Sequence, residues 1–203
     1  MKHAYPVAVG SVIALAVTLL ITQVGFPFAL IVGGSATVAF FVWLLTTYRH
    51  PVDGRRILPL FVLAVGMQFV HMTEEFLADF PGHFSALTGA DLTSDKFVLV
   101  ALLGGGMAYA FAGFGIVHRH PVANYILWFF LIGPAGLVNS VAHVSFPFMS
   151  GTPYFPGLIT VALPTVFGTA LALRILADAR QESQRSAAPS TAPSTAPSTA
   201  VGI

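Results

Sequence analysis

Long apolar runs separated by short polar segments dominate the pattern of this chain. A helix needs about 20 residues to cross the hydrocarbon core of a bilayer, and six runs are about that long. They cover residues 7–24, 28–47, 57–80, 97–117, 122–143 and 155–176. The first run is longer than a signal-peptide core and has no small-residue cleavage site after it, so we expect it to be retained. The pattern predicts an all-α fold, a polytopic transmembrane helix bundle with six spans.

Polar, turn-forming segments connect the runs, at residues 49–56, 81–96 and 118–121. After the sixth run the chain becomes polar and then repeats Ala-Pro-Ser-Thr three times, from Ala188 to Thr199. Such a low-complexity segment cannot bury a core. We therefore expect a six-helix transmembrane domain over residues 1–177 and a disordered cytoplasmic tail over residues 178–203.

The basic residues gather on one side of this predicted topology. Six spans place both termini on the same side, and eight of the nine Lys and Arg residues fall there: Lys2, Arg49, Arg55, Arg56, Arg119, Arg174, Arg180 and Arg185. Lys96 alone falls on the other side. Because cytoplasmic loops carry the excess of basic residues, we expect both termini in the cytoplasm and a multi-pass protein of the cell membrane.

Composition narrows the class of protein further. Charged residues make up 8% of the chain and hydrophobic residues 56%, whereas a soluble domain has about 25% charged residues. This excludes a soluble cytosolic enzyme, a nucleic-acid-binding protein and a disordered protein. For a chain that belongs in a bilayer, we expect a membrane lipid or a hydrophobic small molecule as partner. The absence of Cys excludes disulfides, iron–sulfur clusters and thiolate metal sites.

Ionisable side chains inside a span are costly and usually functional, and the third run holds several. Gln68, His71 and Glu75 share one face at helical spacing, Glu74 flanks His71, and Asp79 extends the stripe by one turn. A polar clasp between helices is one explanation. However, no span supplies a Lys or Arg at this depth, so these carboxylates must keep their protons or hold a cation.

Two other runs carry polar residues at the same depth. His71 lies roughly 21 Å above the cytoplasmic start of the third run, and Asn139 roughly 25 Å above that of the fifth. Asn139 and His143 share a helix face, and Tyr154 to Thr160 open the sixth run, with Pro156 in its first turn. Pro134 is expected to kink the fifth span. The three groups predict one buried site in the outer third of the membrane.

These motifs resemble a known family. His71-Met72-Thr73-Glu74-Glu75 is similar to the motif that gives its name to the HXXEE family of small integral membrane proteins. Asn139-x-x-x-His143 and Tyr154-x-Pro156-Gly157-x-x-Thr160 resemble the other two motifs of that family, in the same order. The resemblance implies a multi-spanning membrane protein, thought to be enzymatic, with these residues as its site. It names no substrate.

The leading hypothesis is a metal-dependent intramembrane enzyme that acts on a lipid or other hydrophobic substrate. Its candidate metal ligands are His71, Glu74, Glu75 and His143. The set suits Zn²⁺ in hydrolysis or non-haem iron in oxidation. Its candidate catalytic residues are Glu74, Glu75, Asn139 and Tyr154, and its supporting residues are Gln68, Asp79, Pro156, Gly157 and Thr160.

Two alternatives use the same residues. One is a metal-free isomerase or cyclase of a sterol-like or terpene-like substrate, in which one Glu donates a proton while the other Glu or His71 accepts one. The other is a proton-coupled transporter. The sequence shows no internal repeat of the kind that many transporters have.

Overall fold

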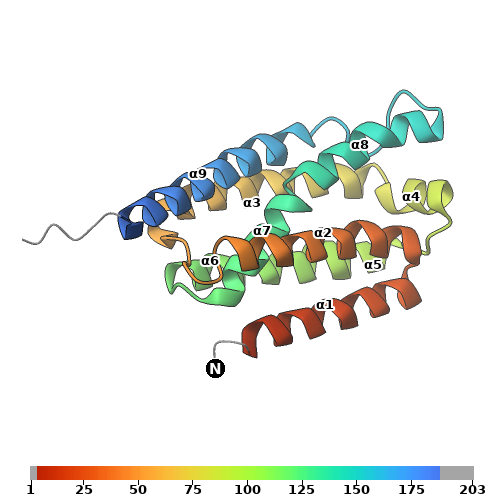
Figure 1. Cartoon of the computed structure of the whole chain (residues 1–203). Helices are drawn as coiled ribbons and strands as arrows, with labels where there is room; N and C mark the ends of the chain where they lie inside the picture. Colours follow the sequence, from red (N-terminus) through yellow and green to blue (C-terminus); the bar gives the residue numbers. More distant parts are fainter. Residues whose placement is uncertain (1–3, 188–203) are drawn as a thin grey trace, which may run out of the picture.

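The computed structural model describes the backbone of residues 4–187 and the side chains of residues 4–181. All regular elements in this part of the chain are helices (Figure 1). They are α1 (Ala4–Gln23), α2 (Phe26–Leu45), α3 (Gly54–Leu77), α4 (Phe80–Thr88), α5 (Ser94–Phe97), the π-helix η1 (Val98–Gly104), α6 (Gly105–Val117), α7 (Pro121–Ile132), α8 (Leu137–Ser150) and α9 (Ala162–Ala187). The all-α prediction is confirmed.

Six helical segments are long and apolar enough to span a membrane, as the hydrophobic pattern predicted. Two of them are composite: α5, η1 and α6 run on as one segment, and α7 and α8 together form another. Helix α3 packs along α9 and α6, while α2 packs between α1 and α7. The beginning of α1 and the end of α9 lie at the same end of the bundle (Figure 1), which is what an even number of spans produces.

The fifth span is broken rather than gently kinked. Helix α7 ends at Ile132, residues 133–136 form a turn, and α8 begins at Leu137. The expectation that Pro134 disturbs this span is thus confirmed. Gly136 is required here, because a Cβ at this position would overlap the carbonyl group of Leu131. The break redirects α8 and its Asn139 and His143 toward α3.

The sixth span begins later than the pattern predicted. Residues 155–161 are not helical, and α9 starts at Ala162, so Pro156 does not open a helix. Gly157 has a φ of +91°, which no helix accommodates, whereas Pro164 falls in the first turn of α9, where proline is tolerated. The segment from Tyr154 to Val161 is therefore an irregular loop, which we call the 154–161 loop.

The far end of α9 also differs from the expected domain boundary. The helix continues to Ala187, so residues 178–187, expected as the start of a disordered tail, are helical. Their Ala, Gln, Glu and Arg residues are good helix formers. The Ala-Pro-Ser-Thr repeats from Ala188 onward lie outside the described residues.

A candidate metal site at the wall of an apolar cavity

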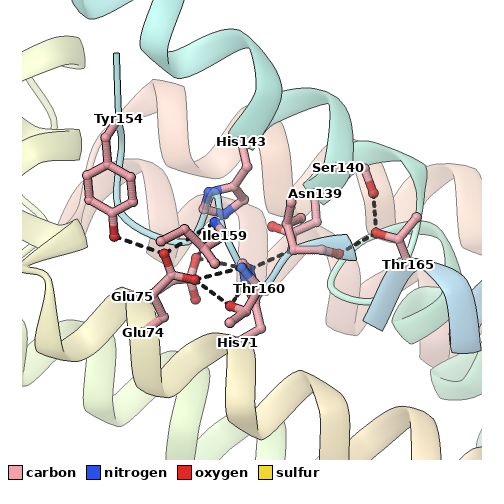
Figure 2. A network of polar contacts seen from close by, with 11 residues as sticks. His71, Glu74, Glu75, Asn139, Ser140, His143, Tyr154, Ile159, Thr160 and Thr165 are labelled. Atoms are coloured by element: carbon pink, nitrogen blue, oxygen red, sulfur yellow. Dashed lines mark hydrogen bonds and ion pairs between the residues drawn. The ribbon is translucent and has the colours of Figure 1, made fainter. Parts of the chain in front are cut away.

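Three buried side chains from two helices point toward one another (Figure 2). His71 and Glu75 lie one turn apart on α3, and His143 comes from α8. His143 Nε2 is 3.0 Å and His71 Nε2 is 3.6 Å from Glu75 Oε1. Each side chain offers one donor atom, and these atoms all lie within 4.8 Å of one another. The group is almost completely shielded, with exposed fractions of 0% for His71, 6% for Glu75 and 1% for His143.

This arrangement can hold a metal ion. Tetrahedral Zn²⁺ with bonds of about 2.0–2.1 Å keeps its ligand atoms roughly 3.3 Å apart, and the two distances to Glu75 Oε1 lie on either side of that value. Two imidazoles and one carboxylate form a donor set that both Zn²⁺ and Fe²⁺ accept.

Glu74 does not join this group, although the sequence placed it among the candidate ligands. Its carboxylate is half-buried and accepts four hydrogen bonds from the 154–161 loop. Glu74 Oε1 accepts from Tyr154 Oη at 2.8 Å and from the backbone N–H of Ile159 at 3.3 Å. Glu74 Oε2 accepts from the backbone N–H of Thr160 at 2.8 Å and from the Thr160 hydroxyl at 2.5 Å. Burial and the hydrogen bond to Glu74 raise the pKa of Tyr154 to about 12. Glu74 thus fixes the loop over the site.

The same contacts set the protonation of His71. The hydroxyl hydrogen of Thr160 is directed to Glu74, so its oxygen can only accept from His71 Nδ1, which lies 3.1 Å away. His71 therefore carries its proton on Nδ1, and its unprotonated Nε2 accepts from the Nδ2–H of Asn139, 3.0 Å away, beside Glu75. Metal-ligating histidines have this form, with the second ring nitrogen donating to a polar group behind it.

Asn139 completes the surroundings of His71, with its Nδ2 3.0 Å from His71 Nε2. His143 is supported differently. Its Nδ1 is buried and has no hydrogen-bond partner among the described residues, and its ring packs against Phe80 and Phe146, with ring centroids 5.4 and 5.6 Å away. Phe80 and Phe146 therefore give one side of His143 an apolar environment, while Glu75 and the ring of His71 lie against its other side.

Gly157 lets the 154–161 loop lie directly on both imidazoles. A Cβ at this position would lie 2.7 Å from His143 Nδ1 and 2.9 Å from His71 Cε1, closer than any real contact. Pro156, beside it, is buried as well. The loop therefore covers the site, and it can lie this close to the two imidazoles only because Gly157 has no side chain.

A cavity of about 480 Å³ borders the site. Glu75, Asn139 and His143 contribute to its wall, and most other lining residues are apolar, including six phenylalanines: Phe28, Phe80, Phe84, Phe97, Phe129 and Phe146. The volume lies within the range of about 300–1,000 Å³ that is usual for small-molecule sites. An apolar cavity with a few polar groups at one place suits a hydrophobic ligand.

The structure separates Asp79 from the site and adds Tyr109 to it. Asp79 is exposed, has a φ of 55° and caps α4 by accepting from the N–H of Gly82, so its expected place on the stripe of α3 was wrong, because α3 ends at Leu77. Gln68 is buried and lines the cavity as its position on that stripe suggests. Tyr109 of α6 also lines it. The sequence held one signal for Tyr109, which is the only polar side chain in the run 97–117.

In comparisons with known proteins, no family model matches the chain, and no curated protein or solved structure shows a significant match. The resemblance to the HXXEE family therefore stays a prediction.

Proposed function

We propose that this protein is an intramembrane enzyme that acts on a lipid or other hydrophobic substrate and uses a divalent metal ion held by His71, Glu75 and His143. The observation that carries the proposal is the position of this buried three-donor group at the wall of an apolar cavity. A metal ion there would act as a Lewis acid or as a redox centre, according to whether it is zinc or iron.

The residues around the donors have separate roles in this proposal. Thr160 and Glu74 hold the lone pair of His71 Nε2 toward the site. Asn139, which also reaches the cavity wall, orients His71 or the polar group of a substrate. Tyr154 secures the cover through Glu74. The phenylalanines around the cavity keep water from a bound substrate, which strengthens the electrostatic interactions at the reacting atoms.

One observation favours a second candidate, metal-free acid–base catalysis as in an isomerase or cyclase. A metal-bound histidine usually donates its other ring N–H to an acceptor, but His143 Nδ1 has no partner among the described residues. In the metal-free case His143 Nε2 and Glu75 Oε1 share one proton across their 3.0 Å hydrogen bond. That pair can deliver a proton to a substrate in the cavity and take one back.

The proposal is tested by incubating the purified protein with a membrane lipid extract and following consumed and formed species by mass spectrometry. We expect conversion by the wild type and by Asp95→Asn, which changes an exposed carboxylate away from the site, and none by Glu75→Gln. Loss of conversion on chelation, with recovery on adding Zn²⁺ or Fe²⁺, supports the metal-dependent form. Conversion that survives chelation supports the second candidate, and conversion by Glu75→Gln contradicts both.

A further inference from the structure

Gln68 has an unusual position in the cavity wall. Its side chain belongs to α3, two turns before Glu75, and is 4% exposed. Its Oε1 is buried and has no hydrogen-bond partner among the described residues. The amide lines the same cavity as Glu75 and His143. The protein therefore leaves a buried amide unpaired in the wall of this cavity.

Packing alone does not explain this residue. Buried polar groups are nearly always hydrogen-bonded, and an unpaired amide is costly in an apolar interior. Two other polar side chains of the wall have partners, since Ser35 donates to the carbonyl of Ile31 and Asn139 contacts His71. A leucine of similar size would fill the space of Gln68 without this cost. The amide is thus accounted for by a ligand group that forms a hydrogen bond with it.

The charge of the cavity limits what that group can be. No Lys or Arg is among the described residues that line the cavity, whereas the carboxylate of Glu75 is. A phosphate or carboxylate headgroup would be repelled and left without a counter-ion. The remaining wall is mostly aliphatic and aromatic. A neutral headgroup on a hydrocarbon body fits both conditions.

We infer that the cavity binds a neutral hydrophobic alcohol, whose hydroxyl hydrogen-bonds with the Gln68 amide and whose hydrocarbon part lies among the phenylalanines beside Glu75 and His143. The amide N–H of Gln68 can also donate to the hydroxyl oxygen, and the Tyr109 hydroxyl lines the same wall. Gln68 and Glu75 are seven residues apart, or roughly 10 Å along α3, so the ligand is long enough to reach both. This inference rests on the proposed function and names the substrate class of that site.

The test compares three probes with the same chain length, dodecan-1-ol, dodecane and dodecanoate, by their effect on the thermal unfolding midpoint of the purified protein in detergent micelles. One hydrogen bond in a dry site favours the alcohol over the alkane about 10-fold in apparent affinity. Gln68→Leu and Gln68→Met should remove this preference. Gln23→Leu, the same change on an exposed side chain at the end of α1, should retain it.

The unliganded variants provide a second readout. Because the Gln68 amide has no partner to lose, both substitutions should fold with a midpoint no lower than that of the wild type. A lower midpoint or failure to fold would show a structural role and overturn the inference, as would equal affinity for alcohol and alkane or the same preference in Gln68→Leu.

A further variant separates this inference from the proposed function. Glu75→Gln should keep the alcohol preference while losing lipid conversion. A wild type with the preference but without conversion would refute the proposed function alone, and conversion without the preference would refute the inference alone.

Discussion

Gly157→Ala tests how closely the 154–161 loop lies on the two histidines. The glycine has a φ of +91°, and its missing Cβ would meet His143 Nδ1 at 2.7 Å and His71 Cε1 at 2.9 Å. An alanine therefore requires a strained backbone and also pushes against both imidazoles. Because the loop is tied to Glu74 by four hydrogen bonds, it cannot move away without breaking some of them.

The backbone strain and the steric contact each have their own cost in free energy of unfolding. An L-residue held at such a φ costs about 1–3 kcal/mol. The contact with His71 is about 0.6 Å shorter than the ~3.5 Å at which carbon atoms touch comfortably, and overpacking of this kind adds about 1–3 kcal/mol. Gly151→Ala is the matched control, because Gly151 has a φ of +68° and no atom within 4 Å of its missing Cβ.

Two measurements on these variants check the reasoning. Reversible unfolding in mixed micelles should show Gly157→Ala to be less stable than Gly151→Ala by about 1–3 kcal/mol, which is the overpacking cost. Competition with a chelator should show metal affinity reduced roughly 10–100-fold in Gly157→Ala, as when supporting contacts of a ligand are lost, and unchanged in Gly151→Ala. Equal stability and equal metal affinity of the two variants would refute the close packing of the loop on the site.

Three further predictions follow from other contacts. Gly136→Ala should lower the free energy of unfolding by more than about 3 kcal/mol in an SDS titration, because its Cβ would overlap the carbonyl of Leu131 at the break between α7 and α8. Thr160→Val should weaken metal binding about 10–100-fold in a chelator competition while Thr160→Ser keeps it, because only the hydroxyl links Glu74 to His71. The phenol of Tyr154, with a pKa of about 12, should stay protonated at pH 11 by ultraviolet absorbance and ionise at lower pH in Glu74→Gln, since the carboxylate that disfavours the phenolate is gone.

The periodicity of the sequence was sufficient to predict the fold class, because each span must bury its backbone in a helix and expose apolar side chains to lipid. It also pointed to the face of α3 that carries Gln68, His71 and Glu75. The start of α9 was predicted wrongly. The Pro156-Gly157 pair is a turn signal, but the apolar residues around it suited a helix, and the hydrogen bonds to Glu74 that hold the loop are tertiary contacts.

The sequence could not show that Glu75 faces the histidines while Glu74 binds the 154–161 loop. Adjacent residues on a helix point about 100° apart, so only one of the two could face His143, and which one depends on where α8 lies. The break at residues 133–136 sets the direction of α8. Tyr109 joins the cavity through the packing of α6 against α3, which no local pattern encodes.

Titration of the metal-stripped protein with Zn²⁺ in detergent micelles tests most directly whether His71, Glu75 and His143 form one metal site. We predict one ion bound per chain in the wild type and in His118→Ala, which changes an exposed histidine outside the site. Binding should be lost in His71→Ala and in His143→Ala. A wild type that binds no stoichiometric ion, or binding that survives in both of these variants, would contradict the account.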